Sequence, residues 1–186
     1  MQLLKIYYAY FSPGNTTEKV VSHIASSFQN YPVESINLTD YATRQEDYYF
    51  KENELLIIGV PAYGGRVPAP VVDALRHFTG SNTPVVLVAT YGNRDIDDTL
   101  IELKKNVIDK GFIPVGAASF VCQHTFLKEC AEGRPDEEDL KMAEFSLDGR
   151  MTVRGLKENF KKCFGATLRV YTTPACKHHM KALAKL

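Results

Sequence analysis

The 186-residue sequence contains no tryptophan and only four cysteines, all of which lie in its C-terminal half: Cys122, Cys130, Cys163 and Cys176. No two of these cysteines form a C-x-x-C pair. Iron–sulfur and structural zinc sites need closely spaced thiolates, so this pattern predicts no metal site. We expect free thiols in a reducing compartment.

The sequence also lacks an excess of charge of either sign and any long apolar run. Lysine and arginine number 22, as do aspartate and glutamate. A broad basic face is therefore not expected, which argues against a nucleic-acid partner. No stretch approaches the roughly 18 to 20 apolar residues of a membrane span, and Met1 leads directly into a strand-like segment. We expect no membrane association and a cytoplasmic location.

Apolar runs alternate with helix-like patterns along the chain, which has the length of one domain. Strands are predicted at residues 3–11, 33–38, 54–60, 84–90 and 114–122. Helical spacing of apolar residues predicts helices over residues 18–28, 69–78 and about 95–110, with another helix beginning near residues 134–136. We expect one domain over residues 1–162 and a C-terminal tail of uncertain structure over residues 163–186.

Five strands that alternate with helices predict an α/β fold, a three-layer doubly wound five-stranded parallel sheet. The two common doubly wound strand orders are 2-1-3-4-5 and 3-2-1-4-5-6, and five strands favour the first. Ligands of such sheets bind beyond the carboxyl ends of the strands, at the point where the strand order reverses. The loops that follow strands one, three, four and five are therefore the candidate site.

The loop after the first strand is rich in small and hydroxyl residues: Ser12, Pro13, Gly14, Asn15, Thr16 and Thr17. Free amides, hydroxyls and the positive end of the following helix dipole make such a turn suitable for a phosphate. It lacks the lysine of a P-loop and the three-glycine spacing of a dinucleotide-binding turn, so a single monophosphate fits best. An ordinary helix N-cap is the alternative interpretation.

Two further loops each combine a tyrosine with glycine: Pro61, Ala62, Tyr63, Gly64, Gly65, Arg66 and Val67 form one, and Thr90, Tyr91, Gly92, Asn93 and Arg94 form the other. Beside a phosphate site, these loops predict a slot for a flat conjugated ring. His124 follows the last strand and either borders this slot or is an ordinary polar loop residue. The two arginines either lie near the ring or face solvent and pair with Asp95 and Asp97.

The segments AYFSPGNTTEKVV, GVPAYGGRVPAP and ATYGNRDIDDTLIELK resemble the flavodoxin family, in particular the flavodoxin part of bacterial and archaeal proteins that fuse it to a ferredoxin. The resemblance covers about residues 3–145 and implies a flavodoxin-like fold, flavin mononucleotide (FMN) as cofactor and electron transfer as function. It implies that the first loop holds the phosphate and the two tyrosine–glycine loops flank the isoalloxazine ring. Redox partner proteins such as a ferredoxin or a reductase are implied, for a monomer or a homodimer without catalytic residues of its own.

The sequence departs from the flavodoxin pattern in two places. Gly14 and Asn15 stand where the family usually has threonine and glycine, which removes one hydroxyl, although asparagine tolerates the left-handed conformation. No ferredoxin cysteine cluster follows. Two alternatives stay open, an FMN-dependent NAD(P)H:quinone or azo reductase and a flavodoxin-fold interaction module without cofactor. The resemblance also suggests a redox-linked peptide flip at Gly64 or Gly65.

Overall fold

Five parallel strands form the central sheet, in the order β2-β1-β4-β6-β7. The structure is a computed structural model and describes residues 3–143. The strands of this sheet are β1 (Lys5–Tyr10), β2 (Val33–Asn37), β4 (Glu54–Pro61), β6 (Thr83–Tyr91) and β7 (Phe112–Val121). Counted among themselves they have the order 2-1-3-4-5, so the predicted fold class is confirmed. The expected tail, with Cys163 and Cys176, lies outside the described residues.

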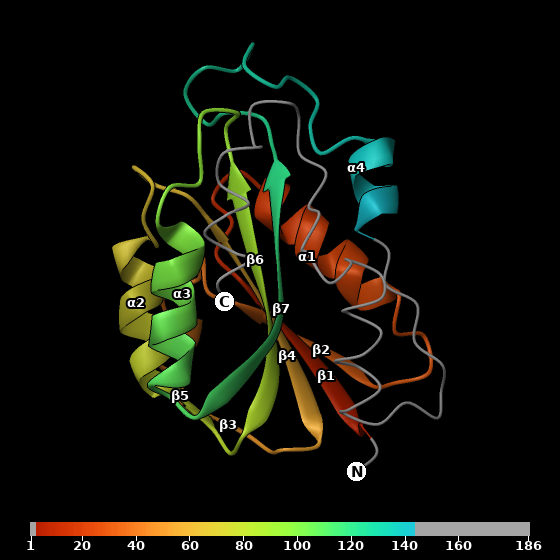
Figure 1. Cartoon of the computed structure of the whole chain (residues 1–186), viewed down its shortest axis with the longest axis vertical. Coiled ribbons are helices and arrows are strands. Elements are labelled where there is room, and N and C mark those ends of the chain that lie inside the picture. The colour runs from red at the N-terminus through yellow and green to blue at the C-terminus, as the bar shows by residue number, and fades with distance from the viewer. Residues whose placement is uncertain (1–2, 144–186) are drawn as a thin grey trace.

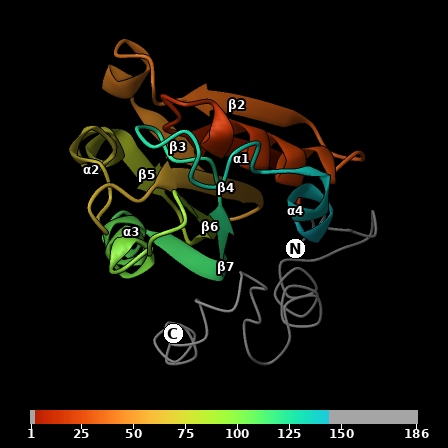
Figure 2. The same ribbon diagram turned by 90° about the horizontal axis from the view of Figure 1, so that it is seen from above.

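Helices cover both faces of the sheet (Figures 1 and 2). On one face lie α1 (Thr16–Ser26) and α4 (Glu137–Met142), and on the other lie α2 (Ala69–Ala74) and α3 (Thr99–Ile108). Right-handed crossovers produce this arrangement when the chain reverses direction across the sheet after β2. Within residues 3–143, no helix is both long and apolar enough to cross a membrane.

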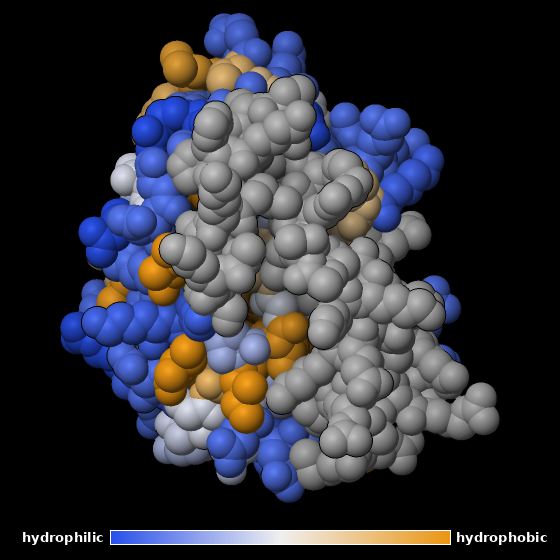
Figure 3. All heavy atoms as spheres, viewed as in Figure 1, coloured by the Kyte–Doolittle hydropathy of each residue, from blue (hydrophilic) through white to orange (hydrophobic). Residues whose placement is uncertain are grey.

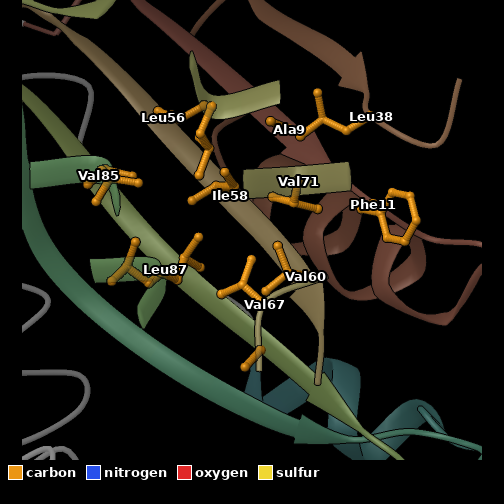
Figure 4. Close-up of a cluster of buried hydrophobic side chains, with 14 of the residues drawn as sticks. Ala9, Phe11, Leu38, Leu56, Ile58, Val60, Val67, Val71, Val85 and Leu87 are labelled. Carbon is orange, nitrogen blue, oxygen red and sulfur yellow. The ribbon is translucent and has the colours of Figure 1, made fainter. Parts of the chain in front are cut away.

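The position of β4 in the middle of the sheet explains why its sequence is an apolar run. Its side chains alternate between two buried clusters, with Leu56 and Ile58 in the cluster beneath α2 and α3 and Leu55 and Ile57 in the cluster beneath α1. Figure 4 shows the first cluster, in which the side chains of β4 lie near Val71 of α2. A strand buried on both faces has no polar side to alternate with an apolar one.

A glycine in β4 allows α1 to pack closely on the sheet. A Cβ atom added at Gly59 would lie 2.2 Å from Cγ2 of Val21 and 3.1 Å from Cγ2 of Thr17. Because interiors are close-packed, a side chain here would push α1 away from the sheet. Gly59 therefore helps to set the position of the first loop, which leads into α1.

The predicted helix over residues 69–78 is wrong at its end. α2 stops at Ala74, a short 3-10 segment η2 (Leu75–His77) follows, and Phe78 begins strand β5 (Phe78–Gly80). β5 pairs in parallel with β3 (Tyr48–Phe50) in a second, two-stranded sheet. Phe78 packs on Phe50 with ring centroids 5.3 Å apart, so this aromatic contact competes with helical continuation.

The helix predicted from about residue 95 begins later, at Thr99. Asp95 Oδ1 accepts hydrogen bonds from the amides of Ile96 at 2.7 Å and Asp97 at 3.2 Å, and Asp97 has a φ of 40°. An aspartate that binds the following amides favours a turn over a helix. The predicted helix end is confirmed, since Gly111 follows it with a φ of 84°.

Candidate functional site

Two adjoining pockets lie where the loops after β1, β4, β6 and β7 meet. The polar pocket has a volume of about 340 Å³ and is lined by Ser12, Pro13, Gly14, Thr16, Thr17, Pro61, Tyr63, Gln123, His124, Thr125 and Lys128. The aromatic pocket has a volume of about 390 Å³ and is lined by Thr16, Pro61, Ala62, Tyr63, Gly64, Thr90, Tyr91, Gly92, Cys122, Gln123, His124, Thr125 and Phe126. The structure thus brings together most of the residues that the sequence predicted.

The first loop presents backbone amides to the polar pocket. Asn15 has a φ of 61° and accepts, through its carbonyl, the first helical hydrogen bond from the amide of Lys19 at 3.1 Å. The amides of Thr16 and Thr17 lie before that bond, in the part of a helix where amides lack intrahelical partners. Asparagine therefore takes the left-handed position that the sequence assigned to it, and the turn directs amides toward the pocket.

Two of the three hydroxyls in this loop already have protein partners. Ser12 Oγ accepts the amide of Glu18 at 3.0 Å, and Thr17 Oγ1 lies 2.7 Å from Thr90 Oγ1 in the buried interior. Thr16 lines both pockets. Because Ser12 Oγ is the acceptor in its bond, its hydroxyl hydrogen stays available, so the loop offers this hydroxyl together with its amides as donors toward a ligand.

The second loop makes a tight turn at the mouth of both pockets. Tyr63 and Arg66 exchange two backbone hydrogen bonds, of 3.0 and 3.1 Å, across Gly64 and Gly65, whose φ angles are 59° and 77°. Two successive positive φ angles define a type I′ turn, for which glycine is the residue with least strain. The carbonyl of Gly65 accepts the amide of Asp98 at 3.0 Å. A reversal of the peptide after Gly65 would break this bond, so the peptide between Gly64 and Gly65 is the better candidate for the hypothetical flip.

The aromatic pocket has one buried tyrosine and one half-exposed tyrosine. Tyr91 is 7% exposed, whereas Tyr63 is 44% exposed and packs edge-on against Phe11 with ring centroids 6.4 Å apart. Partial burial raises the pKa of the Tyr63 phenol, which therefore stays neutral at physiological pH. The pocket thus offers flat aromatic walls without charge.

His124 forms a wall shared by both pockets. Its Nδ1 accepts hydrogen bonds from the amides of Phe126 and Leu127, each at 3.1 Å. A Cβ atom added at Gly92 would lie 2.4 Å from Cδ2 of His124, so the third loop and the imidazole are in direct contact. Since Nδ1 is an acceptor, the neutral ring carries its proton on Nε2.

Arg66 and Arg94 do not line either pocket. Arg66 makes a bidentate contact with Glu102 of α3, with Nε 2.9 Å from Oε2 and Nη2 2.8 Å from Oε1. Arg94 pairs with Asp97, as one of the sequence interpretations expected, whereas the partner of Arg66 was not among the acids considered. Both guanidinium groups are therefore neutralised by carboxylates beside the site.

Glu102 also holds the backbone of the second loop, because its Oε2 accepts the amide of Val67 at 2.9 Å. The hydrogen bonds from Arg66 lower the pKa of Glu102, so this carboxylate stays ionised at neutral pH. Four other predicted residues lie outside the pocket linings: Asn15, Gly65, Val67 and Asn93. Three of them, Asn15, Gly65 and Asn93, have positive φ angles and shape the turns.

The loop after the last predicted strand was among the candidate loops, and its residues Gln123, Thr125 and Phe126 line the pockets beside His124. Two pocket residues were not predicted: Cys122, the last residue of the predicted strand, and Lys128, which lies further along the loop. The thiol of Cys122 is buried, which raises its pKa to about 12 and makes it a poor nucleophile. In residues 3–143 no group of three or more histidine, cysteine, aspartate or glutamate side chains is arranged to hold a metal ion.

Comparisons with known proteins bear on the fold. No protein-family model matches the sequence, and no curated protein matches it. Among solved structures, a flavodoxin from the domain Archaea has a TM-score of 0.54 at 13% identity, over 86% of this chain and 99% of that chain. The chain has a flavodoxin-like fold. Flavodoxin 2 from Bacillus cereus has a TM-score of 0.52 at 15% identity, over 85% of this chain and 98% of that chain.

The flavodoxin-like fold also occurs inside a longer protein. Rubredoxin oxygen:oxidoreductase from Desulfovibrio gigas has a TM-score of 0.50 at 15% identity, over 85% of this chain and 38% of that chain. At identities this low, the similarity to these structures establishes the fold alone and leaves the ligand open.

Proposed function

We propose that this protein binds FMN and transfers electrons, as a flavodoxin does. The observation that carries the proposal is the adjacency of a polar pocket and an aromatic pocket at the carboxyl ends of the strands. FMN joins a phosphate to a flat three-ring system, so it needs two such environments side by side. Both pockets fall within the roughly 300 to 1,000 Å³ that is usual for small-molecule sites.

The donor set of the polar pocket fits a phosphate. The amides of Thr16 and Thr17 lie at the positive end of the α1 dipole, where an anion is favoured. Lys128 adds a cation to the pocket lining, and no aspartate or glutamate lines either pocket. The electrostatics of the site therefore favour a ligand with an anionic group.

The aromatic pocket fits the isoalloxazine ring. Tyr63, Tyr91 and Phe126 supply apolar faces, while Gly64 and Gly92 let the backbone approach a flat ligand closely. When bound, FMN supplies a ring system that accepts and donates electrons singly or in pairs. The large exposed areas of Tyr63 and Phe126 leave one side of the pocket open to a protein partner. We propose redox proteins such as a ferredoxin or a reductase as these partners.

The proposal is tested by ligand binding and turnover. The purified protein, stripped of any bound flavin, is titrated with FMN while flavin fluorescence is recorded, with adenosine monophosphate as a control for phosphate binding alone. We expect saturable FMN binding at micromolar concentration or tighter. Absence of binding up to 100-fold that concentration contradicts the proposal. Sustained NAD(P)H oxidation with a quinone and no partner protein would instead indicate a reductase.

A further inference from the structure

The 122–136 loop is held in shape by backbone hydrogen bonds between its own two arms. The amide of Gln123 donates to the carbonyl of Arg134 at 2.9 Å, and the amide of His124 donates to the carbonyl of Cys130 at 3.0 Å. Near the loop's end, Arg134 Nε donates to Asp139 Oδ2 at 2.7 Å, which ties the loop to α4. Figure 2 shows this loop passing above the ends of the strands, so its residues are placed against the first loop.

Two further contacts fix the loop to neighbouring elements. The Cys130 thiol donates to the carbonyl of Gly92 at 3.4 Å, and Lys19 Nζ of α1 donates to the carbonyl of Pro135 at 2.7 Å. Phe126 and Leu127 of the loop are 88% and 60% exposed. Figure 3 shows apolar surface at the top of the view. The loop is thus held on both sides of the pockets while its tip faces solvent.

Lys128 lies in the turn of this loop that borders the polar pocket. Gln123 Nε2 donates to the carbonyl of Lys128 at 3.0 Å, and the amide of Cys130 donates to the carbonyl of Leu127 at 2.8 Å. These bonds fix the backbone on both sides of the lysine. Lys128 shares the pocket lining with Ser12 and Gly14.

Among the described residues 3–143 Lys128 has no ion-pair partner, in contrast to the two arginines beside the site. Arg66 and Arg94 form ion pairs with Glu102 and Asp97. Within residues 3–143, Lys128 forms no salt bridge with a carboxylate, and it is the one lysine or arginine that lines the two pockets. Its side chain is exposed on a backbone that Gln123 holds in place, so its ammonium group is available to an anionic ligand at a wall without carboxylates.

We propose that Lys128 is a phosphate-recognition residue, whose ammonium group neutralises the phosphate of the bound mononucleotide and selects phosphorylated over unphosphorylated flavin. This inference rests on the proposed function. It also accounts for the first loop, in which Gly14 supplies no hydroxyl where the flavodoxin pattern has a threonine. A phosphate monoester has a second pKa of about 6, so it carries nearly two negative charges at pH 7.5 that uncharged amides and hydroxyls must otherwise stabilise.

The test compares FMN with riboflavin, which lacks the phosphate, on the full chain at pH 7.5. Dissociation constants are measured for the wild type, Lys128→Gln, Lys128→Arg and the control Lys51→Gln. Lys51 is an exposed lysine in the turn before β4, at the opposite end of the sheet, and its replacement changes the net charge equally. We expect Lys128→Gln to weaken FMN binding about fivefold to tenfold, as for the loss of one charge-assisted contact. We expect riboflavin binding to change less than about twofold, and Lys128→Arg and Lys51→Gln to resemble the wild type.

The outcomes separate this inference from the proposed function. If the wild type binds FMN and Lys128→Gln weakens FMN and riboflavin by the same factor, Lys128 is merely structural and the inference fails. It fails equally if Lys128→Gln leaves FMN affinity unchanged. If the wild type binds neither flavin, the proposed function itself fails. A salt titration gives an independent check, since Lys128→Gln should lower the salt dependence of FMN affinity while Lys51→Gln should not.

Discussion

Glu102 lies on α3, and its replacement by alanine should loosen the second loop of the site. Glu102 accepts three hydrogen bonds, two from the Arg66 guanidinium and one from the amide of Val67. The side chain of Arg66 is 63% exposed, so solvent screens its ion pair with Glu102 and the pair adds little to stability. The Val67 amide is partly buried, and a hydrogen bond to a charged group is worth about 1.5 to 3 kcal/mol.

From these contacts we expect Glu102→Ala to lower the free energy of unfolding by about 2 kcal/mol. Glu102→Gln keeps one neutral acceptor and should lower it by about 1 kcal/mol. Urea unfolding followed by circular dichroism measures both values, with Lys105→Gln on the exposed side of α3 as the control. A Glu102→Ala variant within about 0.3 kcal/mol of the wild type would refute the claim that this carboxylate holds the loop.

The same experiment has a pH signature. Because the pKa of Glu102 is lower in the folded protein than in the unfolded chain, its stabilisation is complete above the unfolded carboxyl pKa of about 4.3. It is lost as the pH falls through the lower folded-state value. The stability gap between the wild type and Glu102→Gln should therefore be constant from pH 7 to about pH 5 and narrow below that. A gap that widens in acid contradicts this reasoning.

Three further predictions concern the turn, the shared wall and the buried thiol. In urea unfolding, Gly65→Ala should lower the free energy of unfolding by about 2 to 3 kcal/mol and Gly64→Ala by only about 1. Both glycines have a positive φ, but only a Cβ atom at Gly65 would meet the side chain of Asp97, at 2.3 Å. Equal losses in the two variants count against this reasoning. His124→Ala should weaken FMN binding, in a fluorescence titration, by more than His124→Asn, whose side-chain oxygen can replace Nδ1 as acceptor; equal weakening counts against a role for that acceptor. Burial raises the pKa of Cys122 to about 12, so at pH 8 this thiol should be alkylated far more slowly in the folded than in the unfolded protein. Mass spectrometry of labelled peptides measures the rate. Rapid labelling in the native state would contradict the burial of Cys122.

The sheet could be predicted from the sequence because its signals are local. The apolar runs of β1, β4 and β6 follow from packing against helices on both faces, and each predicted run matches its strand to within two residues at either end. Asn15 and Gly111 were expected in left-handed positions, and both have them. These features depend on residue type and spacing within a few positions of the chain.

The features that the sequence did not predict depend on contacts between distant segments. The pairing of Arg66 with Glu102 spans 36 residues, and the acids nearest in sequence were the more obvious partners. Strands β3 and β5 have three residues each, too few for a periodic signal, and Phe78 also fits a helical stripe. Lys128 reaches the polar pocket only because the 122–136 loop folds back over the strand ends, which no local pattern encodes.

The most direct measurement is an amide nitrogen–proton NMR titration of the ¹⁵N-labelled protein with FMN. The account predicts that the largest chemical-shift changes fall on amides of the two pockets, at Thr16 and Thr17 for the phosphate and at Gly64, Tyr91 and His124 for the ring. Amides at the opposite end of the sheet, such as that of Lys51, should stay unchanged. Changes at a different surface, or none at millimolar FMN, would contradict the assignment of these pockets as a flavin site.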